Sequence, residues 1–219
     1  MDAKELFDGV FSIEGKLATV NMVPRRKVYG EELVEIDGRE YRMWNPYRSK
    51  LAAAIMMGLK SMRIAEGDSV LYLGASTGTT SSHVSDIVGE NGAVYCVEIS
   101  ERSMRDLLKV CEARKNMLPI FGDARRVEDY ADDVKKVDAI YEDVAAPDQA
   151  DILIRNSTLL KKGGLAYIAI KSQSIDISKR PKEVFEGFLE RVSGHFTVVE
   201  TIDIGRYDKK HLFVVLKKA

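Results

Sequence analysis

The side chains best suited to chemistry follow the ends of predicted strands. A loop with two glycines, residues 74–80, comes after the first of these strands and opens a predicted helix. Glu98, Asp123 and Asp143 stand at the ends of the next three strands. The carboxyl ends of parallel strands lie along one edge of a sheet, and ligands bind there. The pattern therefore predicts a cleft in which three acids surround the glycine loop.

This combination favours a nucleoside-type cofactor. Gly74 and Gly78 permit a tight turn and a close approach of the backbone to a ligand. Glu98 lies at about the spacing at which an acid binds ribose hydroxyls, and Asp123 can accept a hydrogen bond from an adenine amino group. Ser76 replaces the second glycine of the usual G-x-G-x-x-G fingerprint, which disfavours a nicotinamide dinucleotide.

Two other chemistries fit the sequence less well. A metal-dependent transferase would need more convergent acids than this cleft offers, so we expect no metal ion. An amino-methylating enzyme typically carries Asn-Pro-Pro-Tyr or Asp-Pro-Pro-Tyr after the fourth strand. The segment that ends in Pro147 lacks that tetrapeptide, and Asn45-Pro46-Tyr47 precedes the core domain.

The elements that must position these residues alternate in type. Apolar runs are predicted as strands at residues 69–74, 93–99, 117–123, 137–144, 165–171, 197–204 and 211–217, with helices at 79–88, 101–114, 148–160 and 182–192. This alternation predicts a parallel sheet covered on both faces. The last two strands are joined by residues 205–210, too few for a crossover helix, so they should pair antiparallel. The prediction is an α/β, Rossmann-like class I methyltransferase fold with a mostly parallel seven-stranded sheet.

A small antiparallel β subdomain is predicted before this core, over residues 1–48, and the core domain over residues 49–219. Short β segments extend from Val10 to about Trp44, and Asp37-Gly38 is a strong hairpin signal. A helix should begin near Ser49. Its apolar stripe would consist of Leu51, Ala54, Ile55, Leu59 and Met62.

Composition limits the class of protein. A chain of 219 residues that is 45% hydrophobic and 31% charged fits one globular core with a small appendage. Cys96 and Cys111 lack partner motifs and are expected to be buried thiols. Charged residues interrupt the first ten positions, and no window approaches about 18 apolar residues. We therefore expect a cytoplasmic protein with no membrane association.

The net charge of −1 argues against a protein that wraps RNA unaided. One basic concentration stands out, with aromatic residues interleaved. It comprises Arg25, Arg26, Lys27, Arg39, Arg42, Arg48 and Lys50, with Tyr29, Tyr41, Trp44 and Tyr47. A solvated face usually explains such a run, but its nearness to the predicted cleft favours a functional surface.

Seven segments are specific enough to indicate a family. They are WNPYRSKLAAAI from Trp44, VLYLGASTGTTSSHVSDIVG from Val70, VYCVEIS from Val94, GDARRVEDY from Gly122, YEDVAAPDQADI from Tyr141, GGLAYIAIKSQSIDISK from Gly163 and YDKKH from Tyr207. Over nearly its whole length the chain resembles archaeal-type fibrillarin, the methyltransferase subunit of box C/D ribonucleoproteins. The resemblance implies guide-RNA-directed 2'-O-methylation of ribose in rRNA and tRNA, with S-adenosyl-L-methionine as the methyl donor.

The resemblance also implies particular site residues. With the two glycines of the loop, the cofactor contacts fall on Gly74, Gly78, Thr79, Thr80, Glu98, Ile99, Asp123, Ala124, Asp143, Val144, Ala145 and Ala146. A Lys-Asp-Lys-His tetrad falls on Lys50, Asp143, Lys171 and His211. The chain departs from the family twice. Ala146 stands where members commonly have glutamine, and Lys210 where they have an acid just before the histidine.

The tetrad suggests how a ribose hydroxyl is activated. Our hypothesis is that Lys171 orients and deprotonates the 2'-hydroxyl, while Lys50 adds positive charge and Asp143 holds both ammonium groups. A lysine acts as a base only if its pKa falls from about 10.4 toward neutrality, and a nearby carboxylate raises it. Orientation is therefore the alternative role for Lys171. His211 would position the ribose or phosphate, or relay the proton.

The implied partners are a box C/D guide RNA, its target RNA, a Nop-domain scaffold protein and a kink-turn-binding ribosomal-type protein. Two alternatives remain open. The near-neutral charge disfavours a stand-alone RNA methyltransferase, and the intact tetrad disfavours a cofactor-binding scaffold subunit without activity. The sequence does not identify the methylated nucleotides, because a guide would choose them by base pairing.

Overall fold

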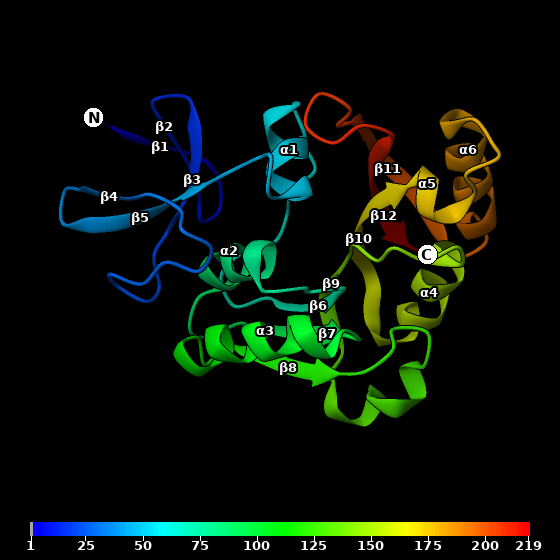
Figure 1. The fold of residues 1–219 in the computed structure, drawn as a ribbon, viewed down its shortest axis with the longest axis horizontal. Coiled ribbons are helices and arrows are strands. Elements are labelled where there is room, and N and C mark those ends of the chain that lie inside the picture. The colour runs from blue at the N-terminus through cyan, green and yellow to red at the C-terminus, as the bar shows by residue number, and fades with distance from the viewer. Residues whose placement is uncertain (1) are drawn as a thin grey trace.

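Two β-sheets form the fold in the computed structural model, which describes residues 2–219 (Figure 1). The larger sheet consists of β6 (Ser69–Leu73), β7 (Ala93–Glu98), β8 (Met117–Phe121), β9 (Val137–Glu142), β10 (Leu160–Lys171), β11 (Phe196–Asp203) and β12 (His211–Lys218). Its strand order is β11-β12-β10-β9-β6-β7-β8. Only β12 runs antiparallel to its neighbours, β10 and β11. The predicted Rossmann-like sheet with an antiparallel last strand is confirmed.

Helices cover both faces of this sheet. They are α1 (Lys50–Met56), α2 (Thr79–Val88), α3 (Glu101–Ala113), α4 (Gln149–Asn156), α5 (Ser172–Ile175) and α6 (Pro181–Val192), with short 3₁₀ turns at 127–129, 131–133 and 157–159. Val84 of α2 packs in the hydrophobic cluster on one face, and Leu153 of α4 packs in the cluster on the other. Along β10, Tyr167 and Ile168 are both fully buried and belong to opposite clusters. This two-sided burial explains why the central strands are continuous apolar runs.

The N-terminal residues form a separate antiparallel sheet with the order β1-β2-β3-β5-β4. Its strands are β1 (Ala3–Phe7), β2 (Val10–Ile13), β3 (Lys16–Val20), β4 (Leu33–Ile36) and β5 (Arg39–Trp44). Asp37 and Gly38 have φ values of 51° and 77° and connect β4 to β5, so the predicted hairpin is confirmed. Strand β1 was not predicted, because its sequence AKELF is mostly exposed and lacks an apolar alternation.

Two helices are shorter than the periodicity predicts. Helix α1 ends at Met56, and Gly58 follows in the left-handed region with φ 98°. Leu59 and Met62 still reach the core, but from an irregular segment, so their assignment to a helical stripe was wrong. Likewise, α4 ends at Asn156 and continues only as a 3₁₀ turn over residues 157–159.

Cys96 and Cys111 are free and buried, as predicted. Burial raises the pKa of the Cys111 thiol to about 11, and it raises that of Cys96 as well. Both side chains therefore serve as small apolar groups in the core. Among residues 2–219, no helix is both long and apolar enough to cross a bilayer.

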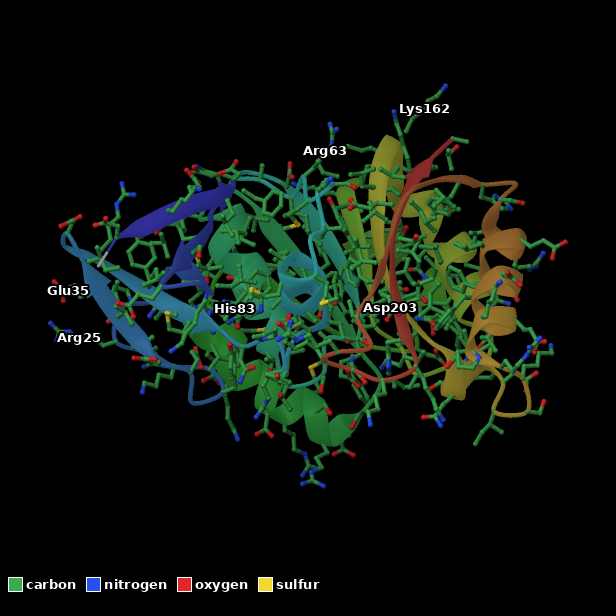
Figure 2. All side chains as sticks on the ribbon, turned by 90° about the horizontal axis from the view of Figure 1, so that it is seen from above. Arg25, Glu35, Arg63, His83, Lys162 and Asp203 are labelled. Atoms are coloured by element: carbon green, nitrogen blue, oxygen red, sulfur yellow. The ribbon has the colours of Figure 1, made fainter. Side chains whose placement is uncertain are left out.

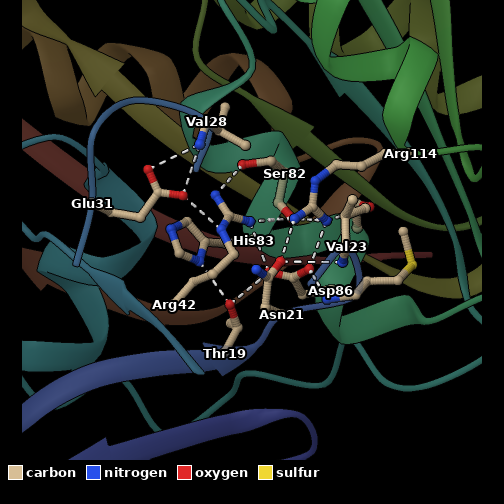
Figure 3. Close-up of polar contacts among 12 residues, drawn as sticks. Thr19, Asn21, Val23, Val28, Glu31, Arg42, Ser82, His83, Asp86 and Arg114 are labelled. Atoms are coloured by element: carbon tan, nitrogen blue, oxygen red, sulfur yellow. Dashed lines mark hydrogen bonds and ion pairs between the residues drawn. The ribbon is translucent and has the colours of Figure 1, made fainter. Parts of the chain in front are cut away.

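A buried network of charges joins the N-terminal sheet to α2 (Figure 3). The Asp86 carboxylate on α2 accepts hydrogen bonds from Arg42 Nη1 at 2.8 Å, Arg114 Nη1 at 2.6 Å and Thr19 Oγ1 at 2.8 Å. Glu31 accepts from Arg42 Nε at 2.7 Å. The Arg42, Glu31 and Asp86 side chains are at most 1% exposed. Such ion pairs hold a structure together because each charge depends on its partner.

This network corrects one sequence interpretation. Arg42, Tyr41 and Trp44 were grouped with a basic, aromatic surface, but all three are buried. Arg25, in contrast, lies at the outer end of the N-terminal sheet (Figure 2). The functional part of the basic run therefore narrows to the residues near the cleft.

His83 lies inside this interface and not in the cleft (Figure 2). Its ring stacks on Trp44 with centroids 4.7 Å apart, and its two nitrogens lie 2.8 Å from Thr19 Oγ1 and 2.7 Å from Tyr29 Oη. Burial, with help from Arg42 and Arg114, holds the pKa of His83 well below its usual value. The imidazole is therefore neutral and acts as a packing group.

Candidate active site

The carboxyl ends of β6, β7, β8, β9 and β10 surround a cleft of about 270 Å³. The predicted cofactor-binding residues that line it are Gly74, Glu98, Ile99, Asp123, Ala124, Asp143, Val144, Ala145 and Ala146. Lys171 lines it as well. The sheet thus brings together acids that are far apart in the sequence, at the edge where α/β folds bind ligands.

The loop after β6 approaches the loop after β9 very closely. Gly74 has φ 82°, and a Cβ atom at this position would lie 2.7 Å from the Asp143 carbonyl oxygen. Gly78, with φ 92°, is the N-cap of α2 and packs against Leu107 of α3. Glycine is required at both positions, for a left-handed backbone and for space.

Gly78, Thr79 and Thr80, also predicted as cofactor contacts, do not line the cleft. Thr80 is buried, and its hydroxyl donates a hydrogen bond to Ser49 Oγ at 3.0 Å. Ser49 in turn caps α1 by accepting from the Ala52 amide. Thr80 therefore connects the start of α2 to the start of the helix that carries Lys50.

The Glu98 carboxylate is fixed by two backbone amides. Its Oε2 accepts from the Ser76 N–H at 2.7 Å, and its Oε1 accepts from the Ser100 N–H at 2.7 Å. Each oxygen keeps a further lone pair, so this carboxylate can still accept from two hydroxyls. Ser76 lines the cleft and was not among the predicted site residues. Only its place in the glycine loop indicated a role.

Asp123 belongs to a short chain of ionic contacts. Its Oδ1 accepts from the Arg125 N–H at 2.9 Å, and the Arg125 guanidinium lies 3.5 Å from the same carboxylate. Arg125 Nε also contacts Asp148 Oδ1 at 3.1 Å. Arg125 lines the cleft but was missed in the sequence, because nothing in its spacing distinguishes it from a solvated arginine.

Three predicted tetrad residues meet at one carboxylate. Asp143 Oδ1 lies 2.9 Å from Lys171 Nζ, and Oδ2 lies 3.1 Å from Lys50 Nζ. The three side chains are 16–20% exposed. Burial tends to raise the pKa of Asp143, but the two ammonium groups outweigh it and hold the pKa below its ordinary value. A single carboxylate therefore holds two cations at the mouth of the cleft.

His211 joins this group through an acid that sequence reasoning missed. Asp208 Oδ1 lies 3.0 Å from His211 Nδ1, and Asp208 Oδ2 lies 3.6 Å from Lys50 Nζ. His211 also pairs directly across from Lys171 in the register of β10 and β12. The signal for Asp208 was its place in the YDKKH segment, three residues before the histidine.

Lys210, where family members commonly have an acid, has a backbone role. It adopts φ 63°, and its carbonyl accepts from the Ser172 N–H at 3.3 Å and the Ser172 hydroxyl at 2.9 Å. Asp208 supplies the carboxylate beside His211 instead. Ala146, the second departure, is 4% exposed and packs in the cluster that includes Ile152.

The two adjacent acids at the end of β9 have different environments. Asp143 opens onto the cleft, whereas Glu142 is fully buried and does not line it. In the part of the chain that the structure describes, neither Glu142 carboxyl oxygen has a hydrogen-bond partner. Burial, together with Asp143 and Asp148, raises the pKa of Glu142 well above its usual value. Glu142 is therefore a neutral acid behind the cleft.

Comparisons with known proteins agree with this arrangement. The model of the fibrillarin family matches residues 1–219. The fibrillarin-like rRNA/tRNA 2'-O-methyltransferase of Pyrococcus abyssi is 48% identical, over 98% of this chain and 97% of its own length. The structure of Aeropyrum pernix fibrillarin with natively bound S-adenosyl-L-methionine superposes with a TM-score of 0.91 at 41% identity, covering 99% of this chain and 98% of that one.

A third relative is known in an assembly. The structure of a fibrillarin/Nop5p complex superposes with a TM-score of 0.89 at 37% identity, covering 99% of this chain and 100% of the other. These matches extend over both sheets, because they cover nearly every residue of this chain. The shared strand-end cleft and the full-length match lead to the same result: the chain belongs to the fibrillarin family.

Proposed function

We propose that this protein transfers the methyl group of S-adenosylmethionine to ribose 2'-hydroxyls of rRNA and tRNA, as the catalytic subunit of a guide-RNA particle. The observation that carries the proposal is the Lys50–Asp143–Lys171 group at the mouth of a cleft with fixed acids. The Pyrococcus abyssi relative is named for this reaction, and the Aeropyrum pernix relative holds this cofactor.

The cleft residues fit such a cofactor. Glu98 would accept hydrogen bonds from the ribose hydroxyls, and Asp123 would accept from the adenine amino group. Asp143 to Ala146 form the wall next to Gly74, where any side chain would meet the Asp143 carbonyl. When bound, the cofactor supplies an electrophilic methyl group on a sulfonium centre.

Gly74→Ala tests this close packing. A Cβ atom 2.7 Å from the Asp143 oxygen, on a residue with φ 82°, should force the two cleft loops apart. We expect the Kd for S-adenosylmethionine to rise by about tenfold or more, as measured by isothermal titration calorimetry. Gly67→Ala is a matched control, because Gly67 has φ 85° but open space around its Cβ position. An equal loss of affinity in both variants would show that backbone strain, not contact, is responsible.

The tetrad would activate the substrate hydroxyl. Lys171 Nζ, held by Asp143 Oδ1, lies at the cleft wall, where it can receive the 2'-hydroxyl proton as the ribose oxygen bonds to the methyl carbon. Asp143 favours a charged Lys171, and Lys50 opposes this by sharing the carboxylate and adding its own positive charge. The Asp208–His211 pair would hold the ribose or its phosphate on the other side of Lys50.

The RNA is proposed to be held by partners. The chain has a net charge of −1, so its own field gives little attraction for a polyanion. A Nop-domain scaffold is supported by the fibrillarin/Nop5p complex. We propose that a kink-turn-binding protein and a box C/D guide RNA complete the particle. We further propose that it works in the cytoplasm, whose reducing conditions suit two free thiols.

The test is methyl transfer from labelled S-adenosylmethionine to a matched RNA, with the product mapped to a single ribose. Each reaction omits one component: the scaffold protein, the kink-turn protein or the guide RNA. Modification of one 2'-oxygen that requires all three supports the proposal. Efficient transfer by the chain alone would identify a stand-alone enzyme, and no transfer by the assembled particle would identify an inactive scaffold subunit.

A further inference from the structure

An exposed aromatic pair lies beside the tetrad. Tyr47, in the loop before α1, meets Tyr207, in the β11–β12 loop, edge to face with ring centroids 5.0 Å apart. Tyr47 is 70% exposed, whereas Tyr207 packs against the core. An exposed tyrosine that is held by a second, anchored ring presents a fixed flat surface to solvent.

The same two loops carry the tetrad. Tyr47 precedes Lys50 by three residues, and Tyr207 directly precedes Asp208, which contacts both Lys50 and His211. Any group that rests on the Tyr47 ring therefore lies close to a group bound at the tetrad.

Cationic side chains surround the pair. The Arg206 guanidinium lies 5.7 Å from the Tyr207 ring centroid, and the Arg48 guanidinium lies 5.6 Å from the Tyr29 centroid. Arg48, Arg206 and the neighbouring Lys209 and Lys210 are all exposed. Locally, this surface is positive although the whole chain is nearly neutral, which suits a phosphate backbone rather than an apolar protein segment.

Tyr47 and Arg48 also form one wall of a hollow of about 530 Å³. Tyr29, Trp44 and Pro46 line it too, so its wall is largely aromatic and apolar. The volume lies in the range of pockets that accept small organic groups. A flat group on Tyr47 therefore has space beside it.

We infer that Tyr47, braced by Tyr207, stacks on a base of the target strand next to the methylated ribose, while Arg48 and Arg206 contact its phosphates. The inference rests on the proposed function and adds a substrate-positioning residue to it. Stacking on an aromatic ring is how proteins commonly hold unstacked RNA bases, and it tolerates any base. Such a contact suits an enzyme whose targets are chosen by a guide.

The test uses the particle assembled with Tyr47→Ala, Tyr47→Phe or unaltered protein. The target RNA carries 2-aminopurine beside the methylated position, and its fluorescence is quenched by stacking. Tyr47→Ala should raise KM for the target about tenfold, equivalent to about 1.4 kcal/mol, and relieve the quenching. Tyr47→Phe keeps the ring and should restore both, and the Kd for S-adenosylmethionine should not change.

Each outcome separates the inference from the proposed function. Normal KM and unchanged fluorescence in Tyr47→Ala, with active wild-type particle, would overturn the inference alone. An unaltered particle that transfers no methyl group would overturn the proposed function. Quenching that depends on the Tyr47 ring would support the base contact even then. A loss in Tyr47→Phe as large as in Tyr47→Ala would point to the hydroxyl and contradict stacking.

Discussion

Lys171→Ala is expected to lower kcat for RNA methylation by about 10²- to 10⁴-fold, the usual contribution of a positioned general base. Lys171 Nζ lies 2.9 Å from Asp143 Oδ1 at the wall of the cleft, so its removal leaves no amine at that point. Asp143 would still pair with Lys50 at 3.1 Å, so the carboxylate keeps a counterion. Single-turnover methylation by the assembled particle measures the loss, and calorimetry should show a nearly unchanged Kd for S-adenosylmethionine.

Lys162→Ala is the matched control for this variant. Lys162 is exposed and lies near the opposite end of β10 from Lys171 (Figure 2). It removes the same kind of side chain from the same strand and should methylate RNA at the wild-type rate. Full turnover by Lys171→Ala would refute the base and orientation roles together. A shift of the pH–rate profile in Lys171→Arg would distinguish the two roles, because arginine keeps its proton at all relevant pH values.

Asp86→Ala is expected to reduce the free energy of unfolding by about 3–5 kcal/mol, the usual cost of removing one partner from a buried ion pair. Its carboxylate accepts hydrogen bonds from Arg42, Arg114 and Thr19 and from the Met22 amide. Its loss leaves two buried guanidinium groups short of negative charge. Urea denaturation followed by circular dichroism measures the change.

The control for Asp86→Ala is an ion pair at the surface. Asp106 contacts Lys109 Nζ at 2.7 Å on α3, and both side chains are more than half exposed. Asp106→Ala should leave the urea midpoint close to the wild-type value, because solvent screens such pairs. Equal losses in the two variants would mean that burial of the Asp86 network adds nothing to stability.

Local sequence signals predict most of the fold. The Asp37-Gly38 turn and the short connection at residues 205–210 each determine how two strands pair, and both pairings are present. The extent of α1 was predicted wrongly because Leu59 and Met62 match a helical period by coincidence. Their burial comes from tertiary packing after the helix has ended.

The candidate site was predictable where it depends on strand order. Parallel strands bring Glu98, Asp123 and Asp143 to one edge whatever their side-chain contacts. The contacts themselves depend on distances between remote segments, which spacing does not encode. For this reason the Glu98–Ser76 bond and the place of Asp208 beside Lys50 were missed.

The Arg42–Asp86 network also has a mechanical consequence. Helix α2 begins directly after the glycine loop of the cleft and is gripped through Asp86 by the N-terminal sheet. That sheet cannot swing about residues 45–49 like a module on a flexible linker, because doing so would expose paired buried charges. A partner that docks on the N-terminal sheet is therefore placed relative to the cleft as accurately as one that docks on the core itself.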